Sequence, residues 1–446
     1  MNIKLQDNES IESGKDQFKE MTIDELSDVL SHTIKNDYEN KIITFLAMLS
    51  AYTDKSQLNI SFNAPSSSGK TYIATEIAAL FPSKDKIERS GASPKSFYHS
   101  EGVQIERDGK KYKLVDLERK ILLFYEQPNP ELQKNLRAVL SHDQRELIYS
   151  IAGKDKGKNK TEDIMLRGFP ATVFCSAGLK LDEQEATRAI LLSPEVSEEK
   201  LKEGVHLAAL KGSDETKYNQ WLESLLDRNE LIDRIKAIRS ENVDSIIIEE
   251  SDFVEEKFKK TFGRLKPRHM RDMNHLLSLI KSIALLNVWY RTQSDGKVIA
   301  SHNDIKLGFE LWSKVIESQD MNVPPVVLIL YKSFILPAYE LKARSPGMRD
   351  KMATDQIGLS SQELSSYYLD KEKSVLNQDT LRKQIIPQLI SSGMIAYEQP
   401  QYGDKRSKHI FPKMFPNGRD NLFDENNIGE TGEDDYSEYD QLIAVL

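Results

Sequence analysis

A short Gly-Lys-Thr sequence carries the clearest chemical signal in this chain. Gly69, Lys70 and Thr71 follow an apolar, strand-like run at residues 59–63 and precede a helix-like run at residues 72–80. Such a turn can wrap backbone N–H groups around phosphates at a helix N-terminus, where the helix dipole favours negative charge. A lysine in this position reaches the β- and γ-phosphates, and a threonine hydroxyl binds Mg²⁺. The pattern therefore predicts a P-loop that binds ATP and Mg²⁺.

The loop departs from the usual pattern at one position. Ala64 stands where the first glycine is expected. A Ser/Gly turn that merely precedes a helix is the simpler alternative, but the strand–loop–helix context favours phosphate binding. The residues expected to contact the nucleotide or its metal are Ala64, Pro65, Ser66, Ser67, Ser68, Gly69, Lys70 and Thr71.

A carboxylate follows the next strongly apolar run, at residues 121–124. Glu126 comes 56 positions after Lys70, as the acid of a Walker B strand does. Its carboxylate is expected to bind Mg²⁺ and to orient the attacking water. Tyr125 stands where a first acid is usual, so the metal would rely on Thr71 and water. The alternative is a core strand that ends in an exposed glutamate.

Two more polar residues continue this order. Ser176 ends the strand-like run 171–176 and is a candidate sensor of the γ-phosphate, although it fits a loop cap equally well. Arg188 follows an acidic turn and resembles the arginine finger that reaches the ATP site of a neighbouring subunit, where it would stabilise transition-state charge. A local salt bridge from Arg188 to Asp182 or Glu185 is the alternative.

Residues 146–166, between these strands, predict a β-hairpin, because two strand-like runs flank a Gly/Lys tip. Its tip carries four alternating lysines, which are Lys154, Lys156, Lys158 and Lys160. A ring of such tips would form a positive collar around a nucleic-acid backbone. A solvated lysine loop is the alternative.

In this order and spacing, the P-loop, Glu126, Ser176 and Arg188 resemble an AAA+ ATPase over roughly residues 40–290. A hairpin just before the sensor strand is typical of the AAA+ branch that includes the MCM and superfamily 3 helicases. The resemblance implies a homo-oligomeric ring with ATP at the subunit interfaces, and a hexamer is the expected size. Some members of this branch act on proteins, so the hairpin alone leaves the substrate open.

Arginines also precede the apolar helix expected at residues 276–286. This segment resembles the lid of helicases found beside primases in phages and mobile elements. The resemblance implies Arg271 as the sensor 2 residue on the γ-phosphate, with Arg268 as second choice. Either arginine could instead pair with Asp272.

The C-terminal part changes character. Residues 353–411 resemble a winged helix-turn-helix whose recognition helix is 377–390. Lys405 and Arg406 would form a basic wing tip that contacts phosphates. Such domains also serve as protein docking modules, which is the alternative here.

Strand-like and helix-like runs alternate around these residues. This alternation predicts an α/β fold, with a mostly parallel sheet covered by helices. The expected parts are a helical or flexible segment at 1–37, the ATPase core at 38–195, a helical lid at 196–320, the winged helix at 325–416 and an acidic disordered tail at 417–446.

Composition excludes several classes of protein. The single cysteine, Cys175, excludes an intramolecular disulfide framework and a Cys-rich zinc site. The net charge is −9, but residues 420–446 contain nine acidic residues and no lysine or arginine, so the remainder is neutral. No long apolar run or signal-peptide pattern is present, and we therefore expect a cytoplasmic protein without a membrane segment.

These observations together predict an ATP-dependent DNA helicase or translocase. It would act as a ring on single-stranded DNA in the replication of a mobile element, phage or plasmid. No primase motif is present, so a primase would be a separate partner. One alternative is an AAA+ loader, regulator or defence ATPase that does not unwind DNA. Another is a DNA-binding adaptor whose nucleotide site acts only as a switch.

Overall fold

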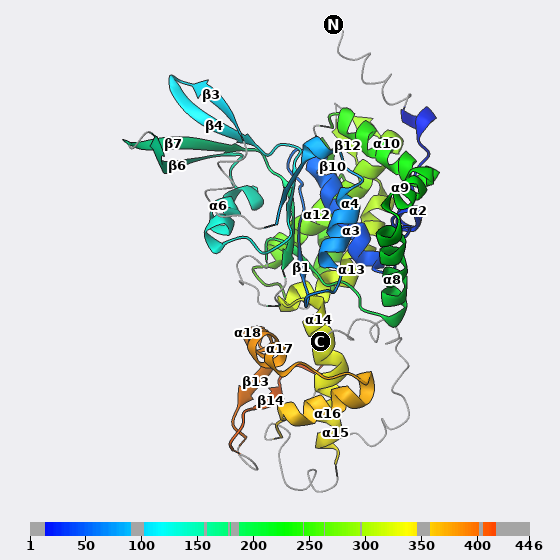
Figure 1. Cartoon of the computed structure of the whole chain (residues 1–446), viewed down its shortest axis with the longest axis vertical. Helices are drawn as coiled ribbons and strands as arrows, with labels where there is room; N and C mark the ends of the chain where they lie inside the picture. Colours follow the sequence, from blue (N-terminus) through cyan, green and yellow to red (C-terminus); the bar gives the residue numbers. More distant parts are fainter. Residues whose placement is uncertain are drawn as a thin grey trace.

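The computed structural model describes residues 14–90, 102–155, 158–176, 179, 187–243, 245–262, 264–294, 297–345, 357–400 and 405–415. A large body contains the N-terminal and central parts of the chain, and a smaller C-terminal body lies below it in Figure 1. Among the described residues no single helix has the length and apolar character needed to cross a membrane. One bent pair, His302–Met321 with Pro325–Ala343, meets that test by length and composition only when its two halves are combined across a 75° bend.

A five-stranded sheet of order β2-β5-β8-β1-β9 forms the centre of the large body. All its neighbouring strands are parallel. Its strands are β1 (Asn59–Asn63), β2 (Lys86–Arg89), β5 (Ile121–Phe124), β8 (Ala171–Ser176) and β9 (Ile190–Leu192). β1, β5 and β9 are almost wholly buried, as expected for parallel strands covered on both faces. The α/β class with a parallel sheet is therefore confirmed.

Helices cover this sheet and share one hydrophobic core with it. The helices that contact its strands are α3 (Tyr38–Leu49), α4 (Lys70–Ala78) and α13 (His302–Met321), and α12 (His269–Leu286) packs against α3 and α13. The same apolar cluster also includes residues of α2 (Ile23–Leu30) and α10 (Leu226–Ser240). Part of the segment expected as a separate lid, 196–320, is thus continuous with the core of the sheet.

The rest of this segment forms smaller elements around the core. They are α8 (Glu198–Ser213), α9 (Glu215–Ser224), α11 (Ser251–Thr261) and a small sheet of β10 (Ser245–Ile247), β11 (Gln293–Ser294) and β12 (Lys297–Ile299). α8 follows β9 after a short connection. Its first turn therefore begins close to the edge at which the parallel strands end.

A second sheet projects from the large body at the upper left of Figure 1. It has the order β3-β4-β7-β6, with β3 (Val103–Arg107), β4 (Lys110–Asp116), β6 (Glu146–Asp155) and β7 (Lys158–Arg167). The apolar face of α6 (Pro130–Leu140) shares a separate core with this sheet, including Leu132 and Leu136. The predicted hairpin 146–166 is present, and a second hairpin lies beside it.

The C-terminal body has its own core. Its elements are α14 (Pro325–Leu330), α15 (Leu336–Ala343), α16 (Ser361–Glu372), α17 (Gln378–Thr380), α18 (Ile386–Ser391), β13 (Ile395–Glu398) and β14 (His409–Pro412). β13 and β14 form an antiparallel hairpin, and Leu359 adds an isolated bridge to Ile410. Helices followed by a hairpin were expected for this part of the chain.

Candidate nucleotide site

The carboxyl ends of β1, β8 and β5 meet at one edge of the parallel sheet. The register pairs Asn63 of β1 with Ser176 of β8, and Phe124 of β5 with Phe174. Ligands of open α/β sheets bind outside the carboxyl ends of the strands. The P-loop, Glu126 and Ser176, which are far apart in the sequence, all follow or end these strands and therefore share this edge.

The predicted phosphate loop connects β1 to α4, and Lys70 is the first residue of that helix. Gly69 has a φ of 93° and Ser67 a φ of 65°, so the backbone turns sharply before the helix begins. A side chain at Gly69 would be strained, which explains the glycine at that position. The loop therefore directs the amino end of α4 toward the carboxyl edge of the sheet.

Lys70 folds back into the loop. Its Nζ donates hydrogen bonds to the carbonyl oxygens of Ala64 at 2.7 Å and Pro65 at 2.5 Å, and contacts Ser68 Oγ at 3.4 Å. The side chain is buried, and this burial lowers the pKa of the ammonium below its ordinary value. Neutral oxygens thus surround a buried positive charge, an arrangement that a phosphate would improve.

Thr71 and Glu126 are the two candidate magnesium ligands. Both are exposed at this edge. Thr71 also contacts the buried thiol of Cys175, whose pKa is raised by burial. Mg²⁺ commonly keeps several water ligands and takes one or two protein groups together with substrate phosphates, so a hydroxyl and a carboxylate suit it. No cluster of three or more His, Cys, Asp or Glu side chains suited to a metal occurs among the described residues.

Tyr125 occupies the place of the usual first acid. Its hydroxyl donates to Glu88 Oε2 at 2.7 Å, and its backbone N–H donates to the Arg89 carbonyl oxygen at 2.9 Å. The ring packs against the main core, and burial is the largest cause of the raised pKa of its hydroxyl. Tyr125 therefore bonds to neighbouring β2, and Glu126 is the acid that follows β5 at this edge.

Ser176 links two strand ends. Its hydroxyl donates to Gln127 Oε1 at 3.1 Å, so β8 is tied to the segment that follows β5. The sequence did not single out Gln127, although its place directly after Glu126 is a usable signal. Ser176 is buried at the carboxyl edge of the sheet, which is the place predicted for a sensor of the γ-phosphate.

Arg188 lies at the opposite, amino edge of the sheet. Its Nε donates to Ser141 Oγ at 2.8 Å, and its carbonyl oxygen accepts from Asn59 Nδ2 at 3.2 Å. Asn59 begins β1, whose five residues separate the two edges by about 13 Å. Asp182 and Glu185, the alternative partners, lie outside the described residues. Arg188 thus stands away from the P-loop of its own chain.

The two sensor 2 candidates have different partners. Arg271 donates to Thr187 Oγ1, next to Arg188, so it too lies at the amino edge and not beside Lys70. Arg268 forms a two-point ion pair with Asp272, at 2.9 and 3.0 Å. Arg268 thus makes the pair with Asp272 that was the alternative, and Arg271 lies away from the loop that holds Lys70.

The lysines of the hairpin lie at its far end. β6 and β7 pair from Glu146–Arg167 to Asp155–Lys158, and the backbones of Lys154, Lys158 and Lys160 belong to the outer part of this ladder. Lys156 lies outside the described residues. The register places the described lysines at the end of the hairpin that is farthest from the main body (Figure 1).

Sequence reasoning missed the neighbouring hairpin of β3 and β4. Asp108 and Gly109 join its strands, with φ values of 53° and 72°. An Asp-Gly pair between strand-like runs is a strong hairpin signal, because this turn needs two residues with positive φ. Lys110 and Lys111 are exposed beside the turn. The projecting sheet therefore carries basic residues at both hairpin ends.

Lys405 and Arg406 lie between β13 and β14 and are exposed, while residues 401–404 are outside the described part. A continuous helix runs from α17 through a π-helical segment at Leu381–Ile385 to α18, where the recognition helix was predicted. This helix also contacts the large body. The N–H of Leu179 donates to Gln384 Oε1 at 2.9 Å, and Gln388 donates to the Leu179 carbonyl oxygen. Leu179 is fully buried in the C-terminal core, only three residues after Ser176.

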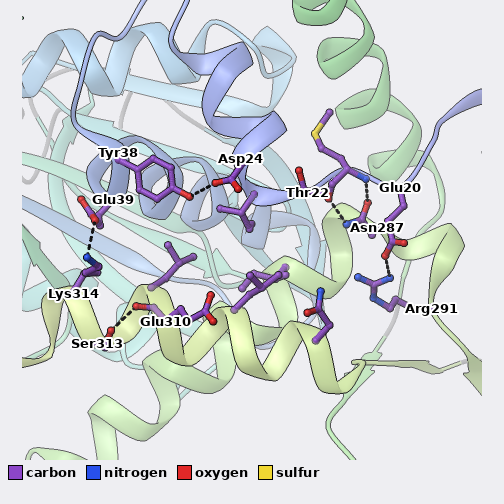
Figure 2. Close-up of a pocket in the computed structure, with 16 residues that line it drawn as sticks. Glu20, Thr22, Asp24, Tyr38, Glu39, Asn287, Arg291, Glu310, Ser313 and Lys314 are labelled. Atoms are coloured by element: carbon purple, nitrogen blue, oxygen red, sulfur yellow. Dashed lines mark hydrogen bonds and ion pairs between the residues drawn. The ribbon is translucent and has the colours of Figure 1, made fainter.

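A cavity of about 710 Å³ lies elsewhere, between the start of α3, the segment before α2, and α13 (Figure 2). Its polar side chains are bonded to one another, as in the pairs Tyr38–Asp24 and Arg291–Glu20. The cavity lining contains none of the predicted nucleotide-site residues. The candidate site is therefore the open carboxyl edge of the sheet.

No family model matches the chain, and no curated protein sequence matches it. The functional argument therefore depends on the order of the residues and on their geometry.

Proposed function

We propose that the chain is an AAA+ ATPase that binds ATP and Mg²⁺ at the carboxyl edge of its parallel sheet. The observation that carries this proposal is the strand order. In an AAA+ module the sensor strand lies between the P-loop strand and the Walker B strand, and β8 lies between β1 and β5. A Ser/Gly turn with no binding role does not require Ser176 and Glu126 at the same edge.

Each residue at this edge has a role in the proposed site. Lys70 exchanges its bonds to the carbonyl oxygens of Ala64 and Pro65 for bonds to phosphate oxygens, which carry more negative charge. Thr71 and Glu126 would hold Mg²⁺, which would neutralise phosphate charge. Glu126 would also orient the attacking water, and the bonded pair of Ser176 and Gln127 would serve as the sensor of the γ-phosphate.

Arg188 supports an oligomeric enzyme. Because it lies at the amino edge, it can reach an ATP site only in a neighbouring copy of the chain. Arg271, bonded to the adjacent Thr187, belongs to the same surface. The proposed assembly is therefore a homo-oligomeric ring, with six copies as the expected number.

We further propose DNA, single-stranded in the working complex, as the substrate of this ring. The projecting sheet carries lysines at the far end of β6 and β7, and Lys110 and Lys111 beside the adjacent turn. Lys405 and Arg406 add a second basic site on the C-terminal body. Lysines on a projecting hairpin suit a phosphate backbone, because each contact releases counterions. ATP turnover would then drive translocation or unwinding during replication of a mobile element, phage or plasmid.

Three enzymatic measurements test this function. The wild-type protein should hydrolyse ATP faster in the presence of single-stranded DNA, and should displace a strand only with ATP. Lys70→Ala should abolish both activities. Turnover without any response to DNA would contradict the helicase and favour a loader, regulator or defence ATPase.

The hairpin can be tested separately. Combined Lys154→Ala, Lys158→Ala and Lys160→Ala should weaken binding to single-stranded DNA and reduce the slope of log K against log salt by about 2, since each phosphate contact contributes roughly 0.7. Lys202→Ala, Lys217→Ala and Lys236→Ala form a matched control, because these lysines are exposed on α8, α9 and α10. Equal losses in both triple variants would remove the hairpin from the proposal.

One observation favours a second candidate. Tyr125 is bonded to Glu88 and stands where a first acid is usual, which suits a protein that binds ATP tightly but turns it over slowly. Such a protein would be a DNA-binding adaptor switched by nucleotide. Tight ATP binding without measurable turnover, with or without DNA, would select this candidate.

A further inference from the structure

A second lysine lies beside the P-loop and has no role in the site described so far. Lys200 belongs to the first turn of α8, and its Nζ lies 3.9 Å from the position that a side-chain carbon on Gly69 would occupy. Its side chain is only 15% exposed. The ammonium groups of Lys70 and Lys200 therefore both lie at the short connection between β1 and α4.

A fully buried carboxylate holds Lys200 in place. Asp37 forms an ion pair with the ammonium, and Lys200 also donates to the carbonyl oxygen of Glu195 at 2.7 Å. The other carboxylate oxygen of Asp37 accepts from the Glu195 N–H at 2.7 Å and from Asn40 Nδ2 at 2.8 Å. Both carboxylate oxygens of Asp37 are thus bonded. These bonds fix the orientation of the carboxylate and therefore the position of the Lys200 ammonium.

The backbone around Asp37 turns sharply. Asn36 and Asp37 both have a φ of 52°, in the left-handed region that asparagine and aspartate adopt more readily than other residues except glycine. Asn36 Nδ2 donates to the hydroxyl of Ser197, which caps α8. This turn therefore holds the start of α8 against the segment before α3.

Further hydrogen bonds tie this cluster to the strand ends of the candidate site. Ser193 follows β9, and its hydroxyl donates to the carbonyl oxygen of Asn63, the last residue of β1. The carbonyl oxygen of Ser193 accepts from Asn40 Nδ2 at 2.9 Å. Lys200 is thus fixed relative to the end of β1, from which the P-loop begins.

We propose that Lys200 is a second nucleotide-binding cation, which contacts the α- and β-phosphates, and that Asp37 is its positioning residue. This inference rests on the proposed ATP site at residues 64–71. The backbone N–H groups of a P-loop surround the α- and β-phosphates, and Gly69 lies directly before the helix that begins with Lys70. A phosphate oxygen takes the place of the Glu195 carbonyl oxygen at the Lys200 ammonium, while Asp37 keeps that ammonium directed at the loop.

Binding of fluorescent ATP and ADP analogues to the full chain tests this role. Lys200→Met should weaken both nucleotides by a similar factor, roughly tenfold, because a contact with the α- and β-phosphates is common to both. Lys202→Met is the matched control, since Lys202 lies on the same helix and is 72% exposed. Wild-type affinity in Lys200→Met, or an equal loss in Lys202→Met, would overturn the proposal.

A double variant separates binding from folding. Lys200→Met alone leaves the buried Asp37 carboxylate without its ammonium, which destabilises the fold. Asp37→Asn combined with Lys200→Met removes both charges, and should unfold near the wild-type temperature while still binding ADP weakly. Wild-type ADP affinity in this double variant would overturn the role of Lys200.

The same measurements distinguish failure of this inference from failure of the ATP site. If Lys70→Ala loses nucleotide while both Lys200 variants bind as wild type, only the role of Lys200 is wrong. If the wild-type protein binds neither ATP nor ADP, the P-loop proposal is wrong, and the role of Lys200 is wrong with it.

Discussion

The two edges of the parallel sheet hold their cationic side chains in different ways. At the carboxyl edge, the largely buried Lys70 and Lys200 bond to carbonyl oxygens whose places phosphate oxygens can take. At the amino edge, Arg188 donates to the hydroxyl of Ser141 in its own chain. The first edge therefore presents cations to the proposed nucleotide, and Arg188 at the second edge does not reach it.

Two partly buried histidines also distinguish the amino edge. His142 follows Ser141 and packs edge-on against Phe169, and His275 lies on α12 near the backbone of Arg188. Burial lowers the pKa of each imidazole to about 4, so both are neutral at physiological pH. Strand direction explains the difference between the edges, because helices that follow parallel strands begin at the carboxyl edge, where their N-termini favour anions.

The largest expected effect concerns Arg188, which in the proposed ring lets the amino edge contribute to the ATP site of a neighbouring copy. Arg188→Ala should lower ATP turnover by roughly 10³-fold and leave ATP affinity unchanged. Arg145→Ala is the control, since Arg145 is exposed and paired with Asp54 and Glu118. Mixing Arg188→Ala with Lys70→Ala protein should restore part of the turnover, because some interfaces then combine intact residues. Wild-type turnover in Arg188→Ala would confine the chemistry to the carboxyl edge.

Glu126 tests the carboxyl edge itself. Glu126→Gln should reduce turnover by about 10²-fold while ATP still binds, because the amide cannot orient and activate water as a carboxylate does. Steady-state hydrolysis and nucleotide binding measure the two effects separately. Glu131→Gln, at an exposed position in the first turn of α6, should leave turnover unchanged. If Glu126→Gln also does so, Glu126 is simply the exposed end of a core strand.

Acid should destabilise the amino edge. The folded state lowers the pKa of His142, so it binds fewer protons than the unfolded chain between about pH 4 and the ordinary imidazole value. Its contribution to stability is complete above that value and is lost as the pH falls toward 4. When the pH falls from 7 to 5, the unfolding free energy of His142→Gln should decrease by less than that of the wild type. The difference between the two decreases should be roughly 2 kcal/mol or less. Denaturant unfolding at both pH values measures this, and identical losses would contradict it.

Tyr125 should give the smallest effect. Tyr125→Phe removes the hydrogen bond to Glu88, whose side chain is 43% exposed and is readily hydrated after the loss. We expect a decrease in unfolding free energy of about 0.5 kcal/mol and unchanged ATP turnover. A large change in turnover would instead place the tyrosine hydroxyl in the nucleotide site.

Local patterns predicted much of the fold. The strand, turn and helix expected around Gly69 and Lys70 occur as β1, the following turn and α4, and the hairpin predicted at 146–166 corresponds to Glu146–Asp155 and Lys158–Arg167. The parallel sheet followed from alternating strand-like and helix-like runs. In each case the signal lies within a few consecutive residues, because strand and helix periodicity are properties of neighbouring positions.

Local sequence patterns could not predict contacts between residues that are far apart in the sequence. Asp37 and Lys200 are 163 positions apart, and neither differs in local pattern from an ordinary surface residue. Arg271 was expected to contact the γ-phosphate as a sensor 2 residue, and its contact with Thr187 depends on how α12 packs in the large body. Leu179 and Gln384 are 205 positions apart, and their contact depends on where the C-terminal body docks.

The contact of Leu179 has a thermodynamic consequence. The glutamines that hold its backbone belong to the segment predicted to read DNA, and the residue itself follows the strand that ends in Ser176. If nucleotide binding moves Leu179, it changes the affinity of the C-terminal body for DNA by some factor. Linkage then requires DNA to change nucleotide affinity by the same factor. Through this one buried leucine, each proposed ligand would thus change the affinity for the other, in whichever order the two bind.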